Sequence, residues 1–502
     1  MGRVLLSFWP WSVLCTLALW GHSSHAQAQD FEVLSQRISG EVQEARAFDL
    51  DGDGRKEVIV SLNLHGEQET ERYLRVLQIS PGKDGPGISL RTEWKADPEA
   101  VFWTVGPAAG GGAKRSCYFL ASDGLWELAE GRGAPMTPRH RLRESVFVTY
   151  GQQDGFLWLD AFRDWDGDGQ EEVFLPFARE ARFYRPDAAG TWKRTEAVNL
   201  VPFPIYNNNV LVGRNMGGYQ YLSVMFFPLL TAADLNGDGR RDLISLKTGK
   251  AHCFFRGPDG RLNPEPVVWN LDIRSREERI RKQATLTFRV ADLNRDGCAD
   301  VVVHKVGVKF TDWNAETAVF LGNREGSQPE KPFQRFPSGG LLSGVSVEDL
   351  DGDGYPDLAQ WSVQMGLWPF VEILLRKTVH LNTQIFYAGW PAGFPAEPGY
   401  RMGSDFRINI KKQDYFQGLV PNLSGDFNGD GVNDLVAGRG FDSLAIYPGE
   451  ARRGFSSRAW AELKSPGVNY VTPEDLNGDG KLDLFGYSAE EGASVLFLWL
   501  QR

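Results

Sequence analysis

Histidine and cysteine are scarce in this chain of 502 residues, with 7 and 4 occurrences. His65, His140, His252, His304 and His380 stand singly, as surface or strand-face residues do, and no cluster of them predicts a general base. The motifs H-E-x-x-H and G-x-S-x-G, phosphate-binding glycine loops and helical segments to carry them are absent. The sequence therefore favours a protein that is not an enzyme.

No clustered stripe of lysine and arginine is present, so we expect no nucleic-acid partner. After the first residues no apolar run approaches membrane-spanning length. The exception combines Arg3, the apolar stretch Val4–Trp20 and the small-residue site Ala26-Gln27-Ala28. This pattern predicts a signal peptide at 1–28, with a membrane anchor as the alternative. The mature chain, 29–502, is then expected to be secreted or periplasmic, without a transmembrane span.

Three cysteines remain after that processing, Cys117, Cys253 and Cys298. A sparse, odd set excludes a disulfide framework, although one bridge is possible. The favoured prediction for Cys117 and Cys253 is that both are buried in strands. Cys298 lies inside an acidic turn, where we expect its side chain to be free to vary.

An acidic nine-residue pattern, D-x-[DN]-x-D-G-x-x-[DE], occurs seven times. The copies are loop A (Asp49–Glu57), loop B (Asp164–Glu172), loop C (Asp234–Asp242), loop D (Asp292–Asp300), loop E (Asp349–Asp357), loop F (Asp426–Asp434) and loop G (Asp475–Asp483). Side-chain oxygens at positions 1, 3, 5 and 9, with the backbone carbonyl of position 7, suit the six or more oxygen ligands that Ca²⁺ takes. The glycine at position 6 fits a turn that needs a positive φ.

These positions predict up to seven calcium sites. The candidate ligands are Asp49, Asp51, Asp53, Arg55 and Glu57; Asp164, Asp166, Asp168, Gln170 and Glu172; Asp234, Asn236, Asp238, Arg240 and Asp242; Asp292, Asn294, Asp296, Cys298 and Asp300; Asp349, Asp351, Asp353, Tyr355 and Asp357; Asp426, Asn428, Asp430, Val432 and Asp434; and Asp475, Asn477, Asp479, Lys481 and Asp483. An EF-hand is excluded because position 12 is never the required glutamate and no helices flank the loops. Short apolar runs on both sides predict strand, turn, strand.

The spacing of the loops predicts the architecture. Consecutive first positions are 115, 70, 58, 57, 77 and 49 residues apart, and 115 is twice a repeat of about 57. The missing unit then centres near residue 107, where the glycine-rich turn 103–113 carries no acids. A repeat of this length suits four short strands. We expect an all-β propeller of eight blades, with seven blades plus an insertion as the alternative. Phe31–Ser39 could supply an outer strand missing after loop G and close the ring.

The loops, with the segments Phe320-Leu-Gly-Asn323 and Gly449–Phe455, resemble the FG-GAP/VCBS repeats known from the propeller of integrin α subunits. The resemblance covers 29–502 and implies that each acidic hairpin joins the first two strands of a blade and holds Ca²⁺. Similar repeats occur in surface proteins, lectins and polysaccharide lyases, so the resemblance implies the scaffold rather than the activity. The expected function is an adhesion-like binding module for carbohydrate or protein at the cell surface. A polysaccharide-cleaving enzyme on the same ring is the alternative.

The 77-residue step contains an insertion rich in aromatic residues, proline and glycine, from Phe386 to Tyr415. Because aromatic and arginine side chains are enriched at binding hot spots, Trp390, Tyr400 and Arg401 are candidate ligand-binding residues. An aromatic plug that packs on a blade is an equal alternative. The insertion is not needed to complete the repeat, so the binding hypothesis expects the fold to tolerate its loss.

Overall fold

The computed structural model describes residues 31–502. Its description leaves out 67–68, 83–84, 109–111, 132–133, 147–155, 188–189, 201–202, 208–221, 227–228, 282–283, 308–313, 340, 364–377, 410–414, 418, 420, 441 and 489–493. The predicted signal peptide lies outside the described residues.

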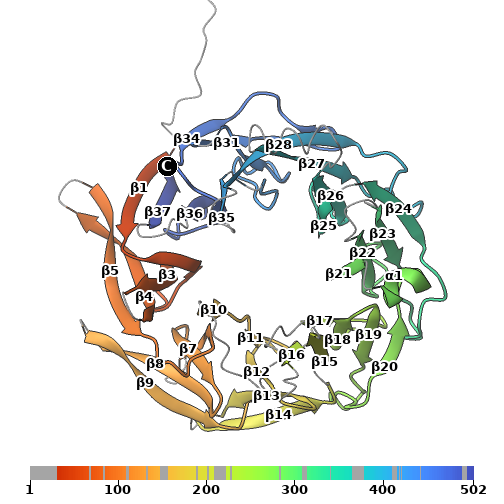
Figure 1. The fold of residues 1–502 in the computed structure, drawn as a ribbon, viewed down its shortest axis with the longest axis horizontal. Coiled ribbons are helices and arrows are strands. Elements are labelled where there is room, and N and C mark those ends of the chain that lie inside the picture. Colours follow the sequence, from red (N-terminus) through yellow and green to blue (C-terminus); the bar gives the residue numbers. More distant parts are fainter. Residues whose placement is uncertain are drawn as a thin grey trace, which may run out of the picture.

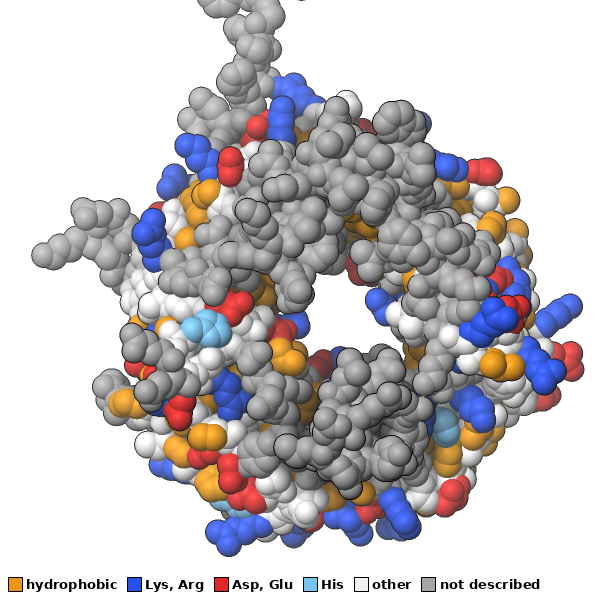
Figure 2. All heavy atoms as spheres, in the orientation of Figure 1, with side chains coloured by type: hydrophobic (Ala, Val, Ile, Leu, Met, Phe, Trp, Pro, Cys, Tyr) orange, Lys and Arg blue, Asp and Glu red, His pale blue; other side chains and the backbone are white. Residues whose placement is uncertain are grey.

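Eight β-sheets form a closed ring around a central opening (Figures 1 and 2). In each blade the strands pair antiparallel in chain order, except that the first strand of the chain joins the last blade. Blade 1 comprises β2 (Glu41–Phe48), β3 (Glu57–His65), β4 (Thr70–Gly82) and β5 (Gly85–Lys95); blade 2 comprises β6 (Phe102–Pro107), β7 (Arg115–Ala121), β8 (Gly124–Gly131) and β9 (Ala134–Arg143); blade 3 comprises β11 (Phe162–Arg163), β12 (Glu172–Pro176), β13 (Ala181–Pro186) and β14 (Trp192–Val198); blade 4 comprises β17 (Leu229–Ala233), β18 (Asp242–Lys247), β19 (Lys250–Phe254) and β20 (Val267–Asn270). Blade 5 comprises β21 (Ala284–Ala291), β22 (Asp300–Gly307), β23 (Asn314–Phe320) and β24 (Gln334–Gly339); blade 6 comprises β25 (Leu341–Glu348), β26 (Asp357–Val363), β27 (Thr378–Phe386) and β28 (Tyr400–Asn409); blade 7 comprises β30 (Leu435–Gly438), β31 (Ser443–Tyr447) and β34 (Ala461–Lys464); blade 8 comprises β35 (Tyr470–Glu474), β36 (Asp483–Tyr487), β37 (Ser494–Gln501) and β1 (Phe31–Ile38). The prediction of eight blades, rather than seven, is confirmed.

A few short elements are added to the blades. They are β10 (Leu157–Trp158), parallel to β6; β29 (Tyr415–Gln417), antiparallel to β28; the hairpins β15 (Phe203–Asn207) with β16 (Leu222–Phe226) and β32 (Gly449–Glu450) with β33 (Gly454–Phe455); and the helix α1 (Arg276–Ile280). In blade 7 the place of a first strand is taken by a single bridge between Asn422 and Val436.

Strand β1 closes the ring. It pairs antiparallel with β37 over its whole length, from Phe31 opposite Gln501 to Ile38 opposite Ser494. Figure 1 shows the first strand of the chain lying beside the last one. The predicted role of Phe31–Ser39 is therefore confirmed, and β37 has no free edge.

Blade 2 is the predicted blade without an acidic loop. Its first two strands, β6 and β7, pair from Phe102 opposite Leu120 to Pro107 opposite Arg115. The turn between them lies where the repeat length places it, and it lacks carboxylates. The long step between loops A and B thus contains one complete blade.

The hydrophobic core is divided among the contacts between neighbouring blades. Among the described residues, eight clusters of buried side chains each join two adjacent blades, which is one cluster for every contact in the ring. The second strand of a blade lies between its two neighbours, so β3, β12, β18, β22 and β36 are buried almost continuously. Cys117 on β7 and Cys253 on β19 are buried free thiols, as predicted.

Within the described residues, no helix is both long enough and apolar enough to cross a membrane.

Candidate metal-binding loops

The acidic loops occupy equivalent places in their blades. In six blades the loop joins the first strand to the second, and loop F leads from the Asn422 bridge into β30. The second strand begins at position 9 in loops A, B, C, D, E and G, so that position is held by the sheet. Positions 1 to 8 form the turn that projects from it.

The aspartate at position 1 organises the turn by accepting backbone N–H groups. In loop A, the two carboxylate oxygens of Asp49 accept from Gly52 at 2.7 Å and from Gly54 at 2.9 Å. Both glycines have positive φ, of 80° and 86°, and this conformation turns their N–H groups toward Asp49. The bond from the glycine at position 6 to position 1 recurs in all seven loops. The predicted need for glycine at position 6 is confirmed.

The aspartate at position 5 uses only one oxygen to hold the turn. In every loop its Oδ1 accepts the N–H of position 7, as Asp53 does from Arg55 at 2.8 Å. The second oxygen, Oδ2, is left for other partners, such as the asparagine amide of position 3 in loops C, D and G.

The acid at position 9 is buried and links the turn to the sheet. One of its oxygens accepts the N–H of position 2 in all seven loops. In the five loops that have aspartate there, the other oxygen accepts a backbone N–H from the following part of the blade. Burial raises the pKa of these carboxyl groups, to about 7 for Glu172, Asp300 and Asp357. An ionised group at this position therefore benefits from a nearby cation.

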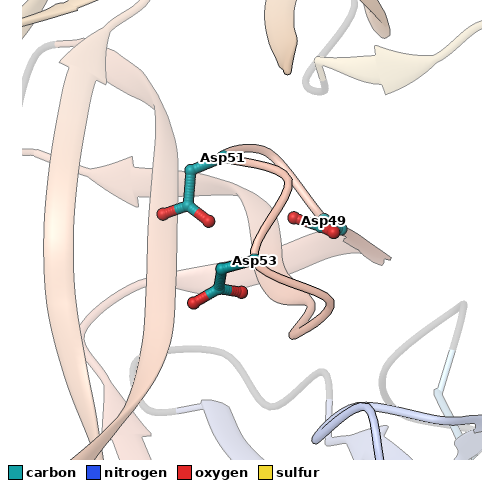
Figure 3. A group of neighbouring side chains, drawn as sticks. All are labelled: Asp49, Asp51 and Asp53. Atoms are coloured by element: carbon teal, nitrogen blue, oxygen red, sulfur yellow. The ribbon is translucent and has the colours of Figure 1, made fainter. Parts of the chain in front are cut away.

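Three loops gather their carboxylates into compact clusters. Asp49, Asp51 and Asp53 in loop A and the equivalent three aspartates in loop E each place one oxygen within 4.8 Å of the others. Loop B forms such a cluster from positions 1, 3 and 9. Figure 3 shows the three carboxylates of loop A around one turn. The separations suit oxygens around a single Ca²⁺ ion, which binds each at about 2.3–2.6 Å.

One atom of loop A supplies a further test of fit. Asp51 Oδ1 is buried and has no hydrogen-bond partner. A buried carboxylate oxygen without a partner is unfavourable, because it loses its hydration and gains nothing in return. A cation in the cluster would supply the missing contact.

The other four loops have asparagine at position 3 and three carboxylates. The asparagine oxygen accepts the N–H of position 5 in each of them. In loops C, D and G the asparagine amide also donates to the aspartate at position 5. An asparagine oxygen is also a ligand for Ca²⁺, so these loops keep the same number of oxygen donors with one charge fewer.

Neighbouring loops also contact one another. Ala299 of loop D donates its backbone N–H to the Asp234 carbonyl of loop C at 2.7 Å. Lys56 of loop A donates in the same way to the Leu476 carbonyl of loop G at 2.9 Å, which links the first acidic loop to the last. The geometry of one loop therefore bears directly on the contact between two blades.

Position 2 is a feature of the loops that sequence reasoning missed. It is always a large apolar residue, and the structure buries it between blades. The residues are Leu50, Trp165, Leu235, Leu293, Leu350, Phe427 and Leu476. The apolar residue directly after the first aspartate was the signal available in the sequence.

The expectation for Cys298 was wrong. Its side chain is buried, with only 1% of its surface exposed, because it faces Gly237 of the neighbouring loop C. A Cβ atom on Gly237 would lie 3.0 Å from the Cys298 sulfur. The thiol is thus a packing group between two loops, while its backbone N–H bonds to Asp296 as in the other loops.

The candidate ligand-binding residues of the insertion lie between β27 and β28 and at the start of β28. Trp390 is half-buried and packs against Phe333 of blade 5, with ring centres 5.5 Å apart. Tyr400 packs edge-on against Phe455 of blade 7 at 5.4 Å. Arg401 is exposed and pairs with Glu397 at 2.6 Å. Trp390 and Tyr400 thus pack against the clusters of two different blade contacts, whereas Arg401 is exposed.

The repeats match a known family. Residues 234–303 and 426–486 match the model of the FG-GAP-like repeat, and these segments hold loops C, D, F and G. The matched segments lie in blades 4, 5, 7 and 8, and in six of the eight blades the hairpin between the first two strands carries the acidic pattern. This chain is a β-propeller with FG-GAP-like repeats. The sequence-based resemblance is confirmed.

Relatives of the FG-GAP propeller include integrin alpha-PS3 of Drosophila melanogaster, 30% identical over 176 residues, which are 31% of this chain and 14% of that protein. Phosphatidylinositol-glycan-specific phospholipase D of Mus musculus is 27% identical over 213 residues, 39% of this chain and 23% of the enzyme. The chain thus spans less than a quarter of either relative. The solved Dos1 propeller aligns with 94% of this chain and 96% of its own at 7% identity and a TM-score of 0.43. The assignment of the propeller fold is based on the strands and sheets of this chain and not on this similarity.

Proposed function

We propose that this FG-GAP propeller is a secreted, calcium-stabilised binding module for a carbohydrate or protein ligand at a cell surface. The observation that carries the calcium part is the cluster of Asp49, Asp51 and Asp53, with its buried, unpartnered Asp51 oxygen. The similarity to an integrin α subunit supports a binding role.

Calcium fits these loops better than a transition metal. The donors are carboxylate, amide and carbonyl oxygens, whereas zinc and copper sites draw on histidine and cysteine. Among the described residues, the cysteine nearest to the donors, Cys298, packs between two loops and carries a thiol whose pKa burial raises to about 11. Each bound ion would hold positions 1, 3, 5, 7 and 9 together and thereby fix the contacts to the next blade.

Removal of calcium tests this proposal. A ligand that binds only the folded state stabilises it by about 2.7 kcal/mol at 100 times its dissociation constant, and several loops contribute. We expect the melting temperature to fall strongly when EGTA replaces calcium in the buffer and to recover when calcium is restored. Metal analysis of the protein before and after chelation is the required companion measurement.

A pair of variants makes the calcium test specific to one loop. Asp430→Asn removes the carboxylate at position 5 of loop F, whereas Glu325→Gln removes an exposed carboxylate outside the loops. We expect the first to reduce bound calcium by one ion per chain and the second to leave it unchanged. An equal melting temperature in calcium and in EGTA, for protein shown to be free of metal, would refute the proposal.

The binding role needs its own measurement. We propose the insertion 386–415 as the recognition segment, with Arg401 as its exposed charged group, because Trp390 and Tyr400 pack against neighbouring blades. A glycan array run with calcium and with EGTA tests the carbohydrate ligand, and Arg401→Ala tests the surface. Calcium-dependent binding that Arg401→Ala weakens is the expected result. Full retention of binding by this variant would place the ligand elsewhere on the ring.

A further inference from the structure

The seven loops fall into two classes by the residue at position 3. Loops A, B and E have aspartate there and so contain four carboxylates, whereas loops C, D, F and G have asparagine and contain three. If nothing else differed, the first class would carry one more negative charge than the second.

In each four-carboxylate loop, one arginine from outside the loop bridges two of the carboxylates. Arg91 of β5 pairs with Asp51 at 2.8 Å and Glu57 at 2.7 Å in loop A. Its other Nη atom reaches Glu130 of blade 2 at 2.9 Å, so the side chain is fixed from both sides.

Loops B and E have the same bridge from different places in the fold. Arg185 of β13 pairs with Asp168 at 2.5 Å and Glu172 at 3.1 Å in loop B. The bridge to loop E comes from the next blade, where Arg452, in the turn between β32 and β33, pairs through its Nε and Nη2 atoms with Asp351 at 3.1 Å and Asp353 at 2.5 Å.

In the part of the chain that the structure describes, the asparagine loops have no such bridge. Among the described residues, no arginine or lysine forms an ion pair with a carboxylate of loops D, F or G. In loop C, Arg240 pairs with a single carboxylate, that of Asp238, and it belongs to the loop itself. In loops A, B and E the bridging arginine brings the charge of the four carboxylates to −3, which is also the charge of the three carboxylates alone in the other loops, but the arginine in addition occupies oxygens that calcium would need. Loop B has a further ion pair, between Asp164 and Arg241 of loop C at 3.4 Å.

The position of each arginine opposes a metal ion. Each guanidinium binds oxygens at two of the positions 3, 5 and 9, which are ligand positions of the proposed calcium sites. Its positive charge repels a divalent cation that is held by the same carboxylates. Arg452 adopts a positive φ of 59°, a strained conformation for a residue with a Cβ, in the turn from which it reaches loop E.

Resting on the proposed calcium function, we propose that Arg91, Arg185 and Arg452 are built-in counter-cations that weaken calcium binding at loops A, B and E. The propeller then has four tighter sites, at the asparagine loops, and three weaker ones that keep their shape through the arginine when calcium is low. The weaker sites then bind calcium at free calcium concentrations at which the tighter sites are already occupied.

Loop E offers the cleanest test because Arg452 is exposed at the surface. We measure calcium bound per chain against free calcium by equilibrium dialysis for the wild type, Arg452→Gln and the matched control Arg453→Gln. Arg453 is the adjacent exposed arginine, so its replacement removes the same charge one residue away. Arg185→Gln repeats the test in loop B.

We expect two classes of site in the wild type. Arg452→Gln should lower the dissociation constant of one weak site by about tenfold, since calcium affinity follows the charge of the ligand set, while Arg453→Gln leaves the curve unchanged. Unchanged or weaker binding in both Arg452→Gln and Arg185→Gln, with normal binding by the wild type, would overturn this inference alone. A wild type that binds no calcium would overturn the proposed function and the inference together.

Discussion

Arg295 is the one residue at position 4 of an acidic loop that is not glycine. It has a φ of 58°, in the left-handed region where the six glycines at this position also lie. In those six loops the N–H of position 4 bonds to the carboxylate of position 1, and this bond is missing for Arg295. Its guanidinium lies 5.1 Å from the centre of the Tyr355 ring in loop E, which links blades 5 and 6.

We expect Arg295→Gly to stabilise the protein by about 1 kcal/mol. Relief of the left-handed strain, about 1–3 kcal/mol, outweighs the loss of an exposed cation–π contact of about 0.5–1 kcal/mol. Gly429→Ala is the reciprocal control, since its φ is 75° and a Cβ would meet no atom within 4 Å. That variant should be destabilised by about 1 kcal/mol through backbone strain alone. Denaturant unfolding in saturating calcium measures both, and a less stable Arg295→Gly would show that the Tyr355 contact dominates.

His304 is a buried histidine with a complete set of neutral partners. Its two ring nitrogens lie 2.8 Å from Thr317 Oγ1 and 2.9 Å from Ser343 Oγ, on neighbouring strands of blades 5 and 6. Burial, with a smaller contribution from the charge of Arg289, lowers the pKa of His304 to about 4. The sequence suggested a histidine on the face of a strand, but it did not reveal that both ring nitrogens have hydrogen-bond partners.

The depressed pKa of His304 predicts a pH dependence of stability. Between about pH 6.5 and pH 4 the unfolded chain binds a proton at this histidine and the folded chain does not, so stability falls as the pH falls through this window. The slope contributed is about 1.4 kcal/mol per pH unit. His304→Gln should lose this contribution, whereas His65→Gln, at an exposed site, should retain it. Equal slopes for His304→Gln and the wild type would contradict the assignment.

At the scale of elements, the insertion places two aromatic side chains, Trp390 and Tyr400, against neighbouring blades. Trp390 joins the cluster between blades 5 and 6, and the Tyr400 ring covers Gly454 of blade 7 so closely that a Cβ there would lie 1.9 Å from its Cδ2 atom. These contacts agree with the alternative drawn from the sequence, an aromatic plug that packs on a blade. Which partner the rings contact depends on residues of other blades, such as Phe333 and Phe455, that the local sequence does not reveal.

Truncation of one insertion ring should therefore destabilise the fold. We expect Trp390→Ala to lower the free energy of unfolding by about 2 kcal/mol, less than for a fully buried tryptophan because Trp390 is half-buried. Arg401→Ala, in the same segment but exposed, should change it by less than about 0.5 kcal/mol. Chemical denaturation of both variants and of the wild type measures these free energies of unfolding. A stability of Trp390→Ala equal to that of wild type would restore the ring as a candidate for binding alone.

In the loops, too, the contacts within one loop could be predicted from the sequence, whereas the contacts from other strands could not. Positions 1, 5, 6 and 9 were predictable because their hydrogen bonds close within nine residues, as in the bond from Gly54 to Asp49. The bridging arginines were not, because Arg91 and Arg452 approach their loops from another strand and another blade. Only the folded ring brings them next to the carboxylates.

At the scale of the whole molecule, closure depends on strands from the two ends of the described chain. The repeat spacing and the short last repeat predicted both the number of blades and the role of β1, because a propeller must complete its final sheet. Phe31 packs into the cluster between blades 7 and 8, and Leu34 and Ile38 pack into the cluster between blades 8 and 1. Strand β1 thus holds the last blade to both of its neighbours.

Deletion of β1 should open the ring. A chain that begins at Glu41 loses eight residue pairs with β37 and leaves the apolar strand Ser494–Gln501 with an unpaired edge, which favours aggregation. We expect insoluble or aggregated protein, and partial recovery of soluble monomer when a synthetic peptide of residues 29–40 is present during refolding. Size-exclusion chromatography with light scattering measures both. A soluble monomer with the wild-type melting temperature, obtained without the peptide, would mean that β37 tolerates a free edge and that the remaining contacts between blades suffice to hold the ring.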